Sequence, residues 1–167
     1  NQGHPESWEK INEILDLIPR ENCHDEDVAQ AIFASSDIII KSPGIPYTHP
    51  ALSEARAKRV EIISEIEYAF RCSDIPVIAI TGTNGKTTTA MMTCELLKSL
   101  GKKVFLGGNI GHPYSELLLD QNEYDLAVIE VSSFQLENII EFRPRVAVLT
   151  NISPSHAERY ESHELYR

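Results

Sequence analysis

The sequence predicts an α/β fold in which helices cover a parallel β-sheet. Short apolar runs rich in β-branched residues alternate along the chain with stretches of helical periodicity. One of these runs leads directly into "TGTNGKTTT", a segment with two glycines and a lysine, and a helical stretch follows it. Strand–helix alternation of this kind is typical of a parallel sheet covered by helices.

The first part of the chain begins with a predicted helix over residues 8–18, because apolar side chains recur there at helical spacing and Pro19 ends the pattern. After a loop rich in proline, Pro50 is well placed at the first turn of a helix that runs to about Arg59. The other elements predicted here are a helix over 25–36, a strand over 37–41, a strand over 60–64 and a helix over 65–70.

A second strand–helix series starts near residues 70–75, and we therefore predict two domains, 1–70 and 71–167. The β-branched run 75–81 is a strand, and the helix after the glycine-rich loop ends near Leu100, with Gly101 as its C-cap. The later elements are a strand over 103–107, a loop over 108–113, a short helix over 114–119, a strand over 124–131, a loop and turn over 132–137 and a strand over 145–151.

Composition narrows the range of functions. The 167 residues carry a formal net charge of -10 with a pI near 5.0, and no cluster of Lys or Arg stands out. This charge argues against a nucleic-acid-binding or anionic-membrane surface. An acidic protein that binds phosphates must use local groups: backbone N–H groups, a lysine and a metal.

The cellular setting is expected to be the cytoplasm. Cys23, Cys72 and Cys94 are widely spaced, which disfavours a disulfide framework or a zinc site and fits a reducing compartment. No apolar run approaches the roughly 18 residues of a membrane helix, and the N-terminus has no signal-peptide pattern. The chain lacks an initiator Met, and its last residues, "HELYR", have the pattern of the beginning of a helix. We therefore expect it to be a piece of a longer protein.

The glycine-rich loop is a candidate phosphate site. Gly82 and Gly85 allow positive φ, so that successive N–H groups can converge on phosphate oxygens at a helix N-terminus. Lys86 would reach the terminal phosphates, and the hydroxyl of Thr87 can bind Mg²⁺. The full eight-residue Walker pattern is absent, because Ile80 stands where its first glycine would be. The alternative is a plain glycine turn with a solvated lysine.

A second candidate lies at the end of the apolar strand "YDLAVIE". Its terminal carboxylate, Glu130, occupies the position of a Walker-B-type acid. Mg²⁺ prefers oxygen ligands, and Thr87 with Glu130 would supply two of them. A charge that simply faces solvent at a strand end is the alternative.

Five segments together resemble the Mur ligases and occur in their order: "SPGIP", "GTNGKTTT", "GGNIGHP", "EVSSFQLE" and "FRPRVAVLTNISPSH". "SSFQLE" and "SPGIP" are most similar to the branch that adds D-glutamate to UDP-N-acetylmuramoyl-L-alanine. The resemblance implies an incomplete Rossmann-like, UDP-substrate-binding domain over 1–70 and the first part of a P-loop, parallel-sheet ATP-binding domain over 71–167. The amino-acid-binding domain of the family has no counterpart here.

The resemblance also implies a reaction and its site residues. ATP phosphorylates the alanine carboxylate to an acyl phosphate, and the amine of D-glutamate then displaces phosphate. ATP and Mg²⁺ are the implied cofactors, and the protein is expected to be a monomer. By this resemblance the residues that contact ATP are Gly82, Thr83, Asn84, Gly85, Lys86, Thr87 and Thr88. The resemblance implies metal ligands at Thr87, Glu130 and His156, and catalytic residues at Lys86, His156 and Asn109. The implied substrate contacts are Ser42, Pro43, Gly44, Asn109, Ser132, Ser133 and Gln135.

From the residues alone, simpler alternatives stay open for each group. Asn109 can favour a turn, residues 42–44 form a turn sequence in any protein, His156 can be a surface histidine, and Ser132, Ser133 and Gln135 can cap a helix. The family usually has an acid before its metal-site histidine, whereas this chain has Ser155, and Glu158 stands where Asp is usual.

Two further functions remain as alternatives: another Mur-type amide ligase, or a non-catalytic relative that binds a UDP-sugar or ATP. A GTPase switch is disfavoured, because neither N-K-x-D nor D-x-x-G follows the loop. The 167-residue piece is expected to be inactive by itself.

Overall fold

The structure, a computed structural model, describes residues 18–24 and 26–153. The predicted helix over residues 8–18 therefore lies, except for Ile18, outside the described residues. The chain forms two compact units. One comprises the chain up to Ile39 together with Ile45–Ile62, and the other comprises Ile40–Gly44 together with the chain from Ile63 onward. In the described part, no helix is both long enough and apolar enough to cross a membrane.

The first unit packs short helices around a small apolar core. Its helical elements are η2 (Arg20–Asn22), α2 (Glu26–Ala34), η3 (Pro50–Leu52) and α3 (Ser53–Ala57). The core consists of Ile39, Leu52, Ala55 and Ile62. Pro50 opens the helical segment as predicted, but the segment starts as a 3₁₀ turn and becomes α-helical only at Ser53. Strands β1 (Ile38–Lys41) and β2 (Glu61–Ser64) form a two-stranded sheet.

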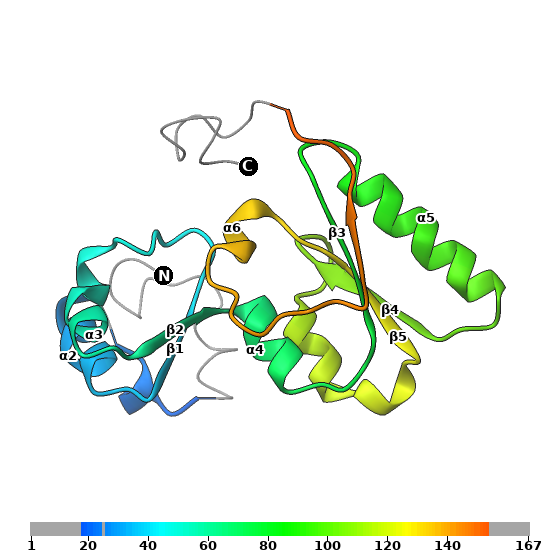
Figure 1. The fold of residues 1–167 in the computed structure, drawn as a ribbon. Helices are drawn as coiled ribbons and strands as arrows, with labels where there is room; N and C mark the ends of the chain where they lie inside the picture. The colour runs from blue at the N-terminus through cyan, green and yellow to red at the C-terminus, as the bar shows by residue number, and fades with distance from the viewer. Residues whose placement is uncertain (1–17, 25, 154–167) are drawn as a thin grey trace. The chain divides into compact units, whose positions relative to one another are not determined.

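The second unit contains the predicted parallel sheet (Figure 1). Its four strands are β3 (Val77–Thr81), β4 (Val104–Gly108), β5 (Leu126–Glu130) and β6 (Val146–Leu149), and its helical elements are α4 (Glu65–Arg71), α5 (Lys86–Ser99), η4 (Tyr114–Leu119), η5 (Gln121–Glu123) and α6 (Ser133–Leu136). The strand order is β4-β5-β3-β6, and every pair is parallel. The carboxyl ends of all four strands therefore lie along one edge of the sheet.

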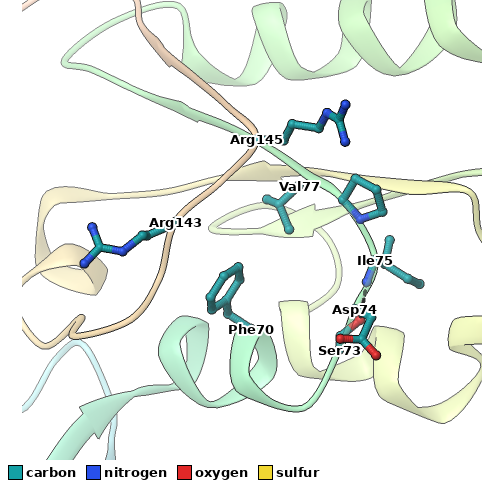
Figure 2. A pocket seen from close by; sticks show the side chains of 8 residues that line it. Phe70, Ser73, Asp74, Ile75, Val77, Arg143 and Arg145 are labelled. Carbon is teal, nitrogen blue, oxygen red and sulfur yellow. Dashed lines mark hydrogen bonds between the residues drawn. The ribbon is translucent and has the colours of Figure 1, made fainter.

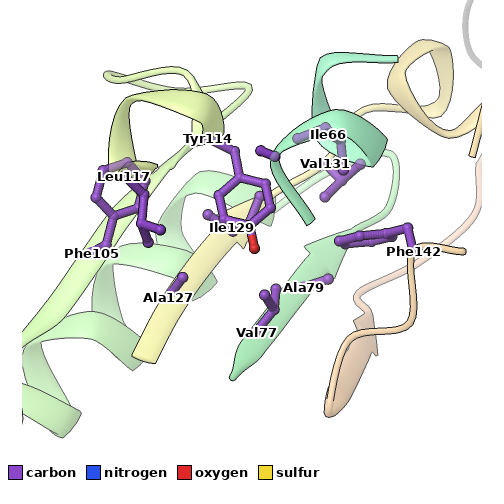
Figure 3. Close-up of a cluster of buried hydrophobic side chains, with 11 residues drawn as sticks. Ile66, Val77, Ala79, Phe105, Tyr114, Leu117, Ala127, Ile129, Val131 and Phe142 are labelled. Carbon is purple, nitrogen blue, oxygen red and sulfur yellow. The ribbon is translucent and has the colours of Figure 1, made fainter. Parts of the chain in front are cut away.

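Helices cover both faces of this sheet, because successive residues of a strand point to opposite faces. On one face, Ala90 and Cys94 of α5 pack against Ile80 and Val128. On the other face, α4 and η4 pack over a larger cluster (Figure 3): Ile66, Ala69, Val77, Ala79, Phe105, Tyr114, Leu117, Ala127, Ile129, Val131 and Phe142. Tyr114 is fully buried there, and burial raises the pKa of its hydroxyl above the ordinary value.

The helix ends follow local chemistry. Leu100 is the C-cap of α5, and Gly101 follows it with φ +79°. The N–H groups of Gly101 and Lys102 bond to the carbonyls of Lys98 and Leu97, so the predicted glycine at this helix end is confirmed one residue beyond the C-cap. The prediction of only a loop and turn over residues 132–137 is wrong. Residues Ser133–Leu136 form a single helical turn, because Ser132 and Gln135 satisfy each other's backbone N–H groups in a capping box.

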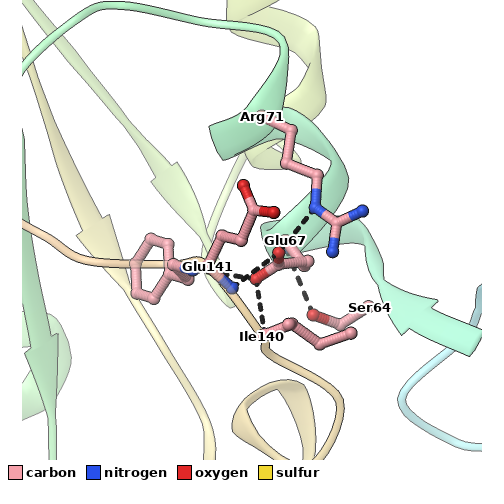
Figure 4. A network of polar contacts seen from close by, with 6 residues as sticks. Ser64, Glu67, Arg71, Ile140 and Glu141 are labelled. Carbon is pink, nitrogen blue, oxygen red and sulfur yellow. Dashed lines mark hydrogen bonds and ion pairs between the residues drawn. The ribbon is translucent and has the colours of Figure 1, made fainter.

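One buried carboxylate anchors the connection between α6 and β6 (Figure 4). Glu67 of α4 is fully buried and accepts the N–H groups of Ile140, Glu141 and Phe142 at 2.8–2.9 Å. The guanidinium of Arg71 donates to the same carboxylate at 2.7 Å. Burial opposes ionisation, but these donors outweigh it, so the pKa of Glu67 lies below its ordinary value. The connection to β6 is thereby tied to α4.

Candidate nucleotide-binding site

The glycine-rich loop joins the end of β3 to the start of α5. Gly82 and Gly85 adopt φ angles of +134° and +80°, as predicted for a phosphate loop. A side chain at Gly82 is also excluded by its neighbours, since a Cβ there would lie 2.2 Å from Oγ1 of Thr150 and 2.9 Å from the carbonyl oxygen of Asn151. At Gly85 the surrounding space is open, and only the backbone conformation favours glycine.

At the end of the loop and in the first turn of α5, consecutive N–H groups have no partner in the described part of the chain. The first backbone N–H of α5 that bonds in the described part of the chain is that of Thr89, which donates to the carbonyl of Gly85 at 3.0 Å. The N–H groups of Gly85, Lys86, Thr87 and Thr88 have no acceptor among residues 18–24 and 26–153. Four consecutive donors at the positive end of a 14-residue helix form a favourable anion site.

Lys86 is held by the loop and is not simply solvated. Its ammonium donates to the carbonyl of Gly82 at 2.8 Å and to that of Thr83 at 3.0 Å. These bonds fold the side chain back over the loop and keep one positive charge beside the free N–H groups. An anion bound there would meet both the ammonium and the helix N-terminus.

Glu130 connects the ends of three segments. It lies at the carboxyl end of β5, only 1% exposed, and one carboxylate oxygen accepts the Thr87 hydroxyl at 2.7 Å. The other oxygen accepts the side-chain amide of Asn109, which follows β4, at 2.8 Å. The alternative of a charge facing solvent at the strand end is therefore wrong. A glycine at position 108 permits this approach, because a Cβ there would lie 2.2 Å from the Glu130 carbonyl.

The residues around Glu130 fit a hard cation. The Thr87 hydroxyl and the Glu130 carboxylate provide adjacent oxygens, which are the ligands that Mg²⁺ prefers. The described residues contain no group of three or more His, Cys, Asp or Glu side chains that would hold a metal by themselves. A Mg²⁺ ion at Glu130 would therefore complete its shell with phosphate oxygens or water, as it does in nucleotide sites.

Two residues for which the sequence predicted no role complete the site. Thr150 and Asn151 follow β6, and we call residues 150–153 the β6 strap. Asn151 bonds to Thr83 and Asn84 of the loop, and the Thr150 hydroxyl donates to the Asn84 carbonyl at 2.7 Å. The predicted strand over 145–151 contained both residues, but β6 ends at Leu149. The available signal was two polar residues at the end of an apolar run, at the edge where a parallel sheet binds ligands.

The other predicted site residues form separate groups. Ser132 and Gln135 bond to each other in the capping box of α6, as the helix-cap alternative predicted, and the Ser133 hydroxyl has no hydrogen-bond partner among the described residues. Ser42, Pro43 and Gly44 form the turn after β1, with Ser42 and Gly44 exposed. His156, Ser155 and Glu158 lie outside the described residues.

A pocket of about 350 Å³ lies at the other end of the sheet (Figure 2). It is lined by residues before and at the start of β3 and before β6, including Phe70, Val77, Arg143 and Arg145. The two arginine side chains point away from each other in Figure 2, so their charges do not converge on one ligand. The phosphate loop, at the carboxyl end of β3, is therefore the better candidate site.

Known proteins match the part of the chain that contains this site. The family described as the Mur ligase middle domain matches residues 80–167. A protein named UDP-N-acetylmuramoylalanine--D-glutamate ligase from Alkaliphilus metalliredigens is 50% identical over 131 residues, which are 78% of this chain and 29% of that protein. Its namesake from Geotalea daltonii is 47% identical over 154 residues, 92% of this chain and 33% of that protein.

A solved structure of UDP-N-acetylmuramoyl-L-alanyl-D-glutamate--2,6-diaminopimelate ligase aligns with a TM-score of 0.46 and 21% identity, over 77% of this chain and 36% of that chain. The present chain spans about a third of the length of the two curated relatives described above.

Proposed function

Since this chain belongs to the Mur ligase family, through the middle domain matched by residues 80–167, we propose that it carries the ATP-binding part of a ligase that adds D-glutamate to UDP-N-acetylmuramoyl-L-alanine. One observation carries the proposal: Glu130 is buried between the Thr87 hydroxyl and the Asn109 amide, beside N–H groups at the start of α5 that have no acceptor among the described residues. The names of relatives about half identical to this chain support the choice of D-glutamate.

The proposed reaction belongs to peptidoglycan precursor synthesis and has two steps. A carboxylate oxygen of the alanine attacks the terminal phosphorus of ATP, the bond to the bridging oxygen breaks, and ADP leaves. The amine of D-glutamate then attacks the acyl carbon, phosphate leaves with the electron pair of the C–O bond, and the nitrogen loses a proton. Both steps concentrate negative charge, so catalysis depends on positioning and electrostatic stabilisation.

We assign the phosphate-binding role to the loop and the start of α5. The N–H groups of residues 85–88 would bind the phosphate oxygens, and Gly82, Thr83 and Asn84 would shape the loop that presents them. The ammonium of Lys86 would neutralise the transferred phosphoryl group, since it already lies on the loop. Thr87 and Glu130 would hold Mg²⁺, which would supply charge neutralisation of the phosphates.

The remaining assignments concern the acceptor substrate. Asn109, fixed by Glu130, would contact the substrate near its reacting carboxylate. Ser132, Ser133 and Gln135, after β5, would line the muramoyl-alanine side. The Ser133 hydroxyl, which has no partner among the described residues, would be available for this contact. The turn of Ser42, Pro43 and Gly44 would lie by the UDP pyrophosphate, and His156 at a second metal site. We assign no residue of this chain to D-glutamate.

We also propose the domain division and the setting. Residues 1–70 would belong to the UDP-substrate-binding domain and residues 71–167 to the central ATP-binding domain, and the P-loop sheet after Arg71 supports this. A monomer in the cytoplasm is the proposed state, which agrees with the free thiols of Cys23, Cys72 and Cys94 in the described chain.

The test uses a protein of the relatives' full length that carries this sequence. ADP release is measured with Mg²⁺, ATP and UDP-N-acetylmuramoyl-L-alanine, with and without D-glutamate, and a Lys86→Ala variant runs alongside. We expect release that requires D-glutamate and is lost in the variant. Release with a different amino acid would point to another Mur-type ligase. ATP binding without release would point to a non-catalytic relative.

A further inference from the structure

Thr150, Asn151 and Ser153 of the β6 strap bond to the phosphate loop. The Ser153 N–H donates to the Thr83 hydroxyl oxygen at 2.9 Å, and that hydroxyl is 3.2 Å from the Ser153 carbonyl. The Thr150 N–H donates to the Thr81 carbonyl at 3.0 Å. Since the loop and the strap are about 70 residues apart in sequence, these contacts are purely tertiary.

Asn151 makes the central contacts of the strap. Its side-chain oxygen accepts the Asn84 N–H at 3.1 Å, and its side-chain nitrogen donates to the Asn84 carbonyl at 2.8 Å. Its own carbonyl accepts the Thr83 N–H at 2.9 Å. One residue thus satisfies both polar backbone groups of Asn84 and the N–H of Thr83.

The identity of this side chain matters for geometric reasons. An amide offers an acceptor and a donor side by side, which matches the N–H and C=O of one residue. A carboxylate of the same size has no donor for the Asn84 carbonyl. The Thr150 hydroxyl reinforces the arrangement, because it donates to the same Asn84 carbonyl and occupies the space that a side chain at Gly82 would need.

These contacts divide the donors of the loop into two sets. The N–H groups of Thr83 and Asn84 are bonded to Asn151 and therefore do not face an anion. The N–H groups of residues 85–88 have no acceptor in the described part of the chain and remain free to bind one. Without the bonds to Asn151, the six N–H groups of residues 83–88 would all lack an acceptor among the described residues, and the loop would not hold them in one orientation.

We propose that Asn151 is a positioning residue for the nucleotide: it holds the phosphate loop in the shape that directs the N–H groups of residues 85–88 at the phosphates. This inference rests on the proposed binding of ATP at the loop, and it adds a residue of the β6 strap to that site. Asn151 acts through the loop backbone, and the nucleotide is bound by the loop.

The experiment compares Asn151→Ala, Asn151→Asp and the wild type, with Asn122→Ala as the matched control, because Asn122 is an exposed asparagine in η5, away from the loop. The affinity for Mg²⁺ and a non-hydrolysable ATP analogue is measured by calorimetry in a full-length protein carrying this sequence. We expect Asn151→Ala to weaken binding by about tenfold to a hundredfold, the equivalent of losing one or two hydrogen bonds. We expect Asn122→Ala to bind like the wild type.

Two further measurements separate positioning from a general loss of stability. Amide hydrogen exchange at Thr83 and Asn84 should be slow in the wild type, and in Asn151→Ala it should become fast at Asn84. In Asn151→Asp the Asn84 N–H should still be protected from exchange, but the affinity for the analogue should be low. In turnover, the KM for ATP should rise while the KM for the UDP-linked substrate stays within about twofold, a difference too small to reflect a lost hydrogen bond.

The proposal is overturned if Asn151→Ala binds the analogue within about twofold of the wild type, since one lost hydrogen bond is worth more than that. It is also overturned if the loss follows only a lowered melting temperature, with both KM values changed alike. If the wild type binds the analogue but shows no D-glutamate-dependent ADP release, the proposed ligase function fails, and the comparison of variants still decides the role of Asn151.

Discussion

Glu130 shows how much of the site depends on one buried side chain. Its carboxylate accepts hydrogen bonds from Thr87 on α5 and from Asn109 after β4, while its own backbone belongs to β5. The Asn109 N–H also donates to the Glu130 carbonyl at 2.8 Å. The helix and the β4 loop are therefore both fixed to the same strand end, and the oxygens that would bind Mg²⁺ are set before any ligand arrives.

The two glycines of the loop should respond differently to substitution. Gly85→Ala places a side chain on a backbone that is already left-handed, with φ +80°, and causes no clash, so we expect a loss of about 1 kcal/mol in the free energy of unfolding. Gly82→Ala adds a collision with Thr150 and Asn151, so we expect a loss of about 3 kcal/mol or more, together with loss of nucleotide binding. Denaturant unfolding of both variants measures the difference. Equal stabilities would contradict the packing of the β6 strap against Gly82.

At the scale of elements, Glu67 links α4 to the segment before β6. Its four donors come from Ile140, Glu141, Phe142 and Arg71. The carboxylate therefore supplies the acceptors that the backbone N–H groups of this irregular segment need. This segment leads into β6 and hence into the β6 strap. Glu67, on a helix that covers one face of the sheet, therefore helps to hold the segment that leads to Asn151.

The lowered pKa of Glu67 predicts a dependence of stability on pH. Because the carboxylate is more easily ionised in the folded chain than in the unfolded one, its contribution is present above its ordinary pKa of 4.5 and is lost as the pH falls through the folded pKa. We expect Glu67→Gln to lower the free energy of unfolding by about 3 kcal/mol at neutral pH and to flatten the decline below pH 4.5.

Denaturant unfolding between pH 3 and pH 7 provides the measurement, with Glu141→Gln as the control because that side chain is exposed. The control should follow the wild-type curve. A Glu67→Gln variant whose stability changes with pH as the wild type does would show that other groups cause the acid sensitivity.

At the scale of the whole molecule, the described residues contain the candidate phosphate site of the proposed reaction, and the chain spans about a third of the length of the two curated relatives. We therefore expect the 167-residue chain by itself to release no ADP with both substrates present. The measurement is a coupled ADP assay, run beside a full-length protein that carries this sequence. Turnover by the short chain at a comparable rate would refute the expectation.

The order of elements and much of the site could be predicted from local patterns. The β-branched runs, the glycines at 82 and 85 and Gly101 at the end of α5 are short-range signals, and each was confirmed by the backbone. The helical turn over Ser133–Leu136 was missed because four residues are too few for a periodic pattern to be visible. The buried state of Glu130 was also open, since a carboxylate at a strand end gives no sign of its neighbours.

By itself, the sequence determined the class of fold, the place of the phosphate loop and the family resemblance, because these depend on residues adjacent along the chain. Only the tertiary structure decided which loop N–H groups lack a partner among the described residues, that Lys86 folds over the loop, and that Thr150 and Asn151 bond to the loop. The physical reason is the parallel sheet, which brings the carboxyl ends of β3, β4, β5 and β6 to one edge. Hydrogen bonds between residues far apart in sequence form there, and no local pattern encodes them.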